Sequence, residues 1–96
     1  MKSAYELAME RLAAAAPAVH LSDDQKRRIA EVEARCKADI AAKELLLCGE
    51  MEKARTAGDA DAMSQLQRQL ADETRRFEEK REREKDAIRA EAENQA

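Results

Sequence analysis

The sequence predicts an all-α fold in which a short helix precedes a long antiparallel helical hairpin, or coiled coil. Three apolar pairs indicate the hairpin, because the residue numbers of each pair sum to 117: Ile29 with Ile88, Ile40 with Phe77, and Met51 with Leu66. Successive members on each arm are eleven residues apart, which makes three turns of a helix with about 3.67 residues per turn. A chain that folds back at Gly58-Asp59 therefore brings these side chains together along one nearly straight seam.

The composition also favours long helices and leaves little material for a larger core. Of the 96 residues 44% are hydrophobic, half of them alanine, and 41% are charged. Two glycines, one proline and 2% aromatic residues complete a composition typical of coiled coils, and it disfavours a globular enzyme. The net charge of -3 gives no general attraction to phosphate backbones or anionic lipid, so neither nucleic acid nor a membrane is an expected partner.

The first helix is expected over residues 3–16. Ser3 and Glu6 have the spacing of a capping box, in which the serine side chain and the glutamate side chain each accept a backbone N–H bond from the other end of the first turn. The side chains on one face follow helical periodicity: Tyr5, Met9, Leu12 and Ala16. Pro17 ends this helix and begins a connector over residues 17–22.

Strong start and stop signals bound the two long helices. Ser22 and Gln25 form a second capping box, which predicts a helix over about 23–57. Gly58 suits the left-handed conformation that closes a helix, and Asp59 or Asp61 can cap the next one. We expect that second arm over about 60–92, so that residues 23–93 form the hairpin, residues 94–96 fray, and residues 1–96 make a single domain.

The seam is expected to be better packed near the turn than at the open end. Leu47 with Leu70 and Ala54 with Met63 also sum to 117. At the open end the same rule places Cys36 opposite Arg81 and Val32 opposite Lys85, which cannot fill an apolar core. We expect the aliphatic stems of the arginine and the lysine to lie over the seam with their charged ends in water.

The middle helix carries a second apolar face, nearly opposite the seam on a helical wheel: Ala30, Ala34, Ala38, Ala41, Leu45 and Gly49. The adjacent run Leu45-Leu46-Leu47-Cys48 cannot be covered by one partner helix, because consecutive residues point about 100° apart. We therefore predict self-association through this helix, as a homodimer or higher homo-oligomer. The predicted contact residues are Tyr5, Met9, Leu12, Ala38, Leu45, Leu46 and Gly49. The alternative is that the first helix folds back and covers part of this face.

No catalytic, cofactor-binding or metal-binding site is predicted. His20 is the sole histidine, and no Cys-x-x-Cys, His-x-x-x-His or Glu-x-x-His spacing occurs. Cys36 lies on the seam and Cys48 near its edge, where free cysteine behaves as a small hydrophobic residue. Glu6 and Glu10 interrupt any signal-peptide core, and no apolar run is long enough to span a membrane. A cytoplasmic protein with no cofactor is the expectation.

The opening residues 2–12, Lys-Ser-Ala-Tyr-Glu-Leu-Ala-Met-Glu-Arg-Leu, carry the one resemblance. They resemble the start of small uncharacterised bacterial proteins with the same charged helical pattern. The resemblance implies no activity and no site. It implies only that the first helix is a feature of a family.

The function predicted from these patterns is that of a non-enzymatic protein–protein interaction or assembly module. A holdase-like chaperone that grips apolar segments between the long arms is an alternative, and it predicts suppression of client aggregation at stoichiometric ratios. A nucleic-acid-associated helical protein is less favoured, because acids interrupt the basic residues of the stretch 75–85 and stacking aromatics are lacking. Such a protein would show salt-sensitive retention on DNA or RNA.

Overall fold

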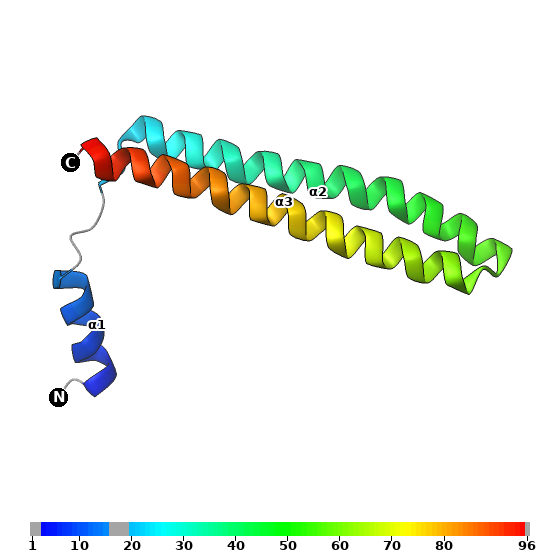
Figure 1. Cartoon of the computed structure of the whole chain (residues 1–96), viewed down its shortest axis with the longest axis horizontal. Coiled ribbons are helices and arrows are strands. Elements are labelled where there is room, and N and C mark those ends of the chain that lie inside the picture. Colours follow the sequence, from blue (N-terminus) through cyan, green and yellow to red (C-terminus); the bar gives the residue numbers. More distant parts are fainter. Residues whose placement is uncertain (1–2, 16–19, 96) are drawn as a thin grey trace.

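The structure, a computed structural model, describes residues 3–15 and 20–95, and side chains within 3–11 and 20–94. These residues form three helices, α1 (Ala4–Ala15), α2 (Asp23–Ala57) and α3 (Ala60–Gln95), of which α2 and α3 lie side by side as a hairpin (Figure 1). The predicted all-α hairpin is confirmed. Pro17 and the rest of the first half of the expected connector, residues 17–19, lie outside the described residues, as does Ala96. α3 continues past its expected end near residue 92, because no glycine or proline follows there to stop it.

Local capping explains where α2 begins. The Ser22 side chain accepts a hydrogen bond from the backbone N–H of Gln25 at 3.0 Å, and Gln25 Oε1 accepts one from the backbone N–H of Ser22 at 2.9 Å. Both halves of the predicted capping box are present, and they satisfy two backbone donors that a helix start otherwise leaves unpaired. α1 starts in a similar way, since Ser3 Oγ accepts from the N–H of Glu6 at 3.2 Å.

The turn between α2 and α3 uses two residues with separate tasks. Gly58 is left-handed, with φ 70° and ψ 24°, and its N–H donates to the carbonyl of Arg55 at 3.1 Å. Asp59 donates its N–H to the carbonyl of Ala54 at 2.9 Å and accepts from the N–H of Ala62 on its side chain at 3.0 Å. Glycine adopts the left-handed conformation without steric cost, and the aspartate, rather than Asp61, caps α3.

The seam between α2 and α3 follows the sum of 117 along its whole length. The α2 positions, at spacings of four, three and four, are all buried or half-buried: Gln25, Ile29, Val32, Cys36, Ile40, Lys43, Leu47, Met51 and Ala54. So are their α3 counterparts: Ala92, Ile88, Lys85, Arg81, Phe77, Thr74, Leu70, Leu66 and Met63. A single straight stripe on each helix therefore accounts for the hairpin. Gln25 and Ala92 extend the stripe beyond the residues that apolar pattern alone identified.

The open half of the hairpin is covered as well as the half near the turn, partly by polar side chains. Cys36 is 5% exposed, and its Sγ donates to the carbonyl oxygen of Phe77 at 3.4 Å. Lys85 Nζ contacts Glu33 Oε1 at 2.7 Å, and only 14% of the lysine side chain is exposed. Burial thus does not favour the half near the turn as we expected, because the long stem of the lysine shields the seam while its ammonium group keeps a partner.

Candidate protein-interaction surface

The side of α2 that faces away from α3 is apolar and uncovered. We call it the back face of α2, and it comprises Ala34, Ala38, Ala41, Ala42, Leu45, Leu46 and Gly49, all exposed. Leu45 is 79% exposed and Leu46 is 58% exposed, so two large apolar side chains meet solvent in the middle of a long helix. Apart from its chain neighbours and the surrounding backbone of α2 itself, no atom lies within 4 Å of the position where a Cβ on Gly49 would stand. Small residues around two leucines permit another helix to approach closely.

A shallow groove continues the back face toward α3. It has a volume of about 270 Å³ and is lined by Ala42, Leu46 and Phe77, with Asp39 and Lys43 at its rim. Phe77 was expected on the seam and is half-buried there, and its contribution to this groove was not predicted. The sequence feature that could have indicated this contribution is the position of Phe77 at the edge of the apolar stripe of α3.

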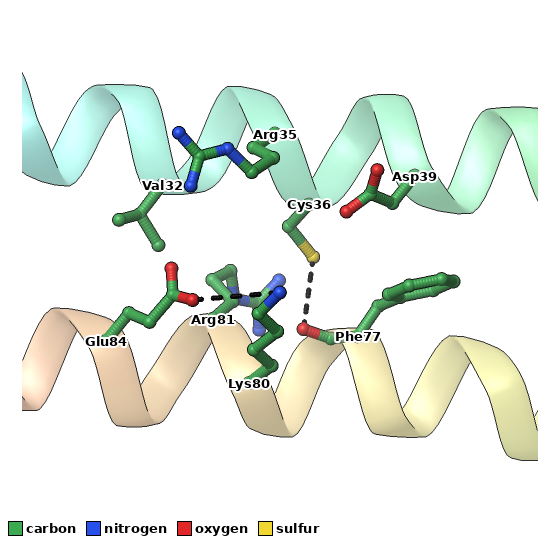
Figure 2. A pocket seen from close by; sticks show the side chains of 8 residues that line it. All are labelled: Val32, Arg35, Cys36, Asp39, Phe77, Lys80, Arg81 and Glu84. Atoms are coloured by element: carbon green, nitrogen blue, oxygen red, sulfur yellow. Dashed lines mark hydrogen bonds and ion pairs between the residues drawn. The ribbon is translucent and has the colours of Figure 1, made fainter.

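A second cavity on the same side of the hairpin shares Asp39 and Phe77 with that groove (Figure 2). Its volume is about 10 Å³, room for about one water molecule. Figure 2 shows the Cys36 thiol directed at the Phe77 carbonyl, and an ion pair between Lys80 Nζ and Glu84 Oε1 at 3.9 Å at the mouth. The cavity is too small for an organic ligand.

Ion pairs between the two long helices lie at the open end of the seam. Arg28 contacts Glu91 through two hydrogen bonds, of 2.6 and 3.1 Å, and this hydrogen bonding lowers the pKa of the glutamate. The hydrogen bond from Lys85 lowers the pKa of Glu33 in the same way. These carboxylates are charged near neutral pH and stabilise the hairpin only while they remain so.

The structure does not bring the predicted contact residues of α1 and α2 together. In the part of the chain that it describes, α1 makes no contact with either long helix, and Figure 1 shows it lying away from the hairpin. Tyr5 is 73% and Met9 is 48% exposed, and the side chain of Leu12 lies outside the described residues. Leu7, which the sequence analysis did not single out, is also exposed. The back face of α2 is therefore not covered by α1 in this conformation.

Within residues 3–15 and 20–95 no group of three or more His, Cys, Asp or Glu side chains is placed to hold a metal ion, and no helix there is long and apolar enough to cross a membrane. Cys36 is a buried free thiol, Cys48 is an exposed one, and His20 is exposed. Comparisons of the chain with protein-family models, curated proteins and solved structures give no match.

Proposed function

We propose that the protein is a non-enzymatic assembly module that associates with a second copy of itself through the back face of α2. The observation that carries this proposal is the exposure of Leu45 and Leu46, at 79% and 58%, on the side of α2 that α3 does not cover. A hairpin needs only one apolar stripe on each helix, and the seam already supplies it. The second stripe on α2 is not needed for the seam of one chain.

The expected association is reversible. Burying a leucine side chain stabilises by about 1.5–3 kcal/mol relative to exposure, so the exposed parts of four leucines in a dimer contribute roughly 5 kcal/mol. Bringing two molecules together costs about 4–15 kcal/mol. The leucines alone do not exceed that cost, and the alanines and rim charges must supply the remainder. We therefore expect a dimer that dissociates on dilution, not a permanent one.

Sedimentation equilibrium over a range of concentrations tests the proposal. We expect the wild-type mass to rise with concentration from that of one chain, 10.8 kDa, toward twice that value. Ala38→Glu and Leu45→Glu should remain monomeric, because each places a charge on the back face without touching the seam. Leu46→Glu is a less specific test of the back face, because Leu46 also lines the groove beside Phe77.

Ala71→Glu is the matched control, because Ala71 is an exposed alanine in the interior of α3 and receives the same charge. It should associate as the wild type does, and circular dichroism should give all variants the same helix content. A wild-type mass of one chain at every concentration would refute self-association. Equal loss of association in Ala38→Glu and Ala71→Glu would show that the back face is not the contact.

A further inference from the structure

We propose that the two copies pair antiparallel along their back faces, with the twofold axis passing between Ala41 and Ala42. This inference rests on the proposed function and adds its partner geometry. In such a pair, residue n of one copy lies at the same height along the helix axis as residue 83 minus n of the other, and we call two such residues level. Ala38 then faces the second copy's Leu45, Ala34 faces its Gly49, and Ala41 faces its Ala42.

Side-chain size favours this register. Leu45 is the most exposed large apolar residue of the back face, and the register sets it against an alanine, where a large side chain can fit between the turns of the facing helix. The twofold axis repeats this contact, so both leucines are accommodated. Gly49, with open space around it, faces an alanine and lets the two backbones come close.

Charge at one edge of the back face favours the same register. Glu31 and Lys53 are 22 residues apart, which is six turns at 3.67 residues per turn, so they lie on the same edge of α2. A twofold axis between antiparallel helices brings like edges together. Glu31 then lies one residue, about 1.5 Å along the axis, from the level of the second copy's Lys53. Arg35 similarly lies about 3 Å from the level of the second copy's Glu50.

Other arrangements lose this complementarity. A parallel pair in register puts the edge that carries Glu31 and Lys53 on opposite sides of the interface in the two copies, so Glu31 does not lie beside Lys53. Sliding the antiparallel pair by eleven residues restores the same faces but moves Glu31 about 15 or 18 Å from the level of Lys53, depending on the direction of the slide. The register around Ala41 and Ala42 therefore sets Leu45 against an alanine and Glu31 beside the second copy's Lys53, although Glu31 is also level with the second copy's Glu52.

Disulfide cross-linking of the full chain tests the geometry. In a Cys48→Ser background, where the buried Cys36 is the remaining native thiol, Ala42→Cys should form a covalent dimer under mild oxidation. The two Ala42 positions lie within one residue of the same level, inside the limit of about 7 Å between Cα atoms for a disulfide. Because pairing raises the effective thiol concentration to about millimolar, cross-linking at micromolar protein should be on the order of a thousandfold faster than by collision.

Gly49→Cys in the same background is the control for direction. In the antiparallel pair the two Gly49 positions are fifteen residues apart in level, about 22 Å, and should not cross-link with each other. A mixture of Gly49→Cys with Ala34→Cys should cross-link. If Gly49→Cys cross-links with itself, the antiparallel register is overturned and self-association stands. The same holds if neither Ala42→Cys nor Gly49→Cys cross-links with itself while the wild type sediments as a dimer. If the wild type is a monomer, both proposals fail.

Discussion

Replacing Leu47 by alanine tests whether the single seam between α2 and α3 holds the hairpin together. Leu47 is 2% exposed, and it is the largest side chain that is fully buried among the described residues. Leu45 lies two residues away on the same helix and is 79% exposed. The same substitution at these two positions therefore compares a buried leucine with an exposed one in nearly identical sequence surroundings.

The expected loss follows from the burial of each side chain. Leucine to alanine removes three carbon atoms, worth about 0.8 kcal/mol each when buried, and the cavity left behind adds to this. A two-helix seam can close partly around the cavity, so we expect Leu47→Ala to cost about 3 kcal/mol, within the known range of about 2–5. Leu45→Ala removes atoms already largely in water and should cost about 0.5 kcal/mol.

Urea unfolding followed by far-ultraviolet circular dichroism measures both losses. The protein should be dilute enough that any dimer has dissociated, so that Leu45 is not covered by a second copy. In thermal unfolding, Leu47→Ala should lower Tm by roughly 12–24 °C, because 1 kcal/mol shifts Tm by about 4–8 °C in domains of this size. Equal losses for the two variants would refute the argument that the seam, and not the exposed surface of α2, stabilises the hairpin.

Three further predictions follow from the caps and the charges. The pKa of Glu33 is lowered in the folded protein from its ordinary value of 4.5. The contribution of this carboxylate to stability is therefore complete above pH 4.5 and is lost as the pH falls through the pKa of the folded state. Acid should lower Tm less steeply in Glu33→Gln than in the wild type. Gly58→Ala should cost about 1–2 kcal/mol, since alanine resists a φ of 70°, whereas Gly49→Ala should stabilise α2 by up to about 1 kcal/mol in the same unfolding assay. Glu31→Lys and Lys53→Glu should each weaken self-association alone and should associate with each other when mixed. Sedimentation of the mixture, compared with the separate variants, measures this. No gain in association on mixing would contradict the proposed contact between Glu31 and Lys53.

The bounds of α2 were predictable because their determinants are local. The capping box of Ser22 and Gln25 and the left-handed Gly58 each act within one turn of the helix end, so a few residues suffice to specify them. The seam was predictable because a two-residue turn sets which residues lie level on the two arms. Once the turn is placed, the apolar spacing identifies the facing side chains.

Three features depended on information that the apolar pattern does not contain. Gln25 is 5% exposed, but a pattern of apolar residues does not identify a polar residue as a core position. The covering of Lys85 depends on reaching Glu33, which is a matter of side-chain conformation. The amphipathic pattern of α1 shows that one face can be buried but not what buries it. The contact surface of Leu45 and Leu46 stays a prediction for the same reason.

The turn at Gly58 also sets the order in which the hairpin can assemble. Ala54 and Met63, next to the turn, are nine residues apart in the chain, whereas Gln25 and Ala92 at the open end are 67 apart. Loop-closure entropy grows with the logarithm of this separation, so forming the distant contact first would cost about 1.8 kcal/mol more than forming the near one. Folding should begin at the turn and proceed toward the open end, with each new contact closing only a few additional residues. α1 is joined to the end that closes last and opens first.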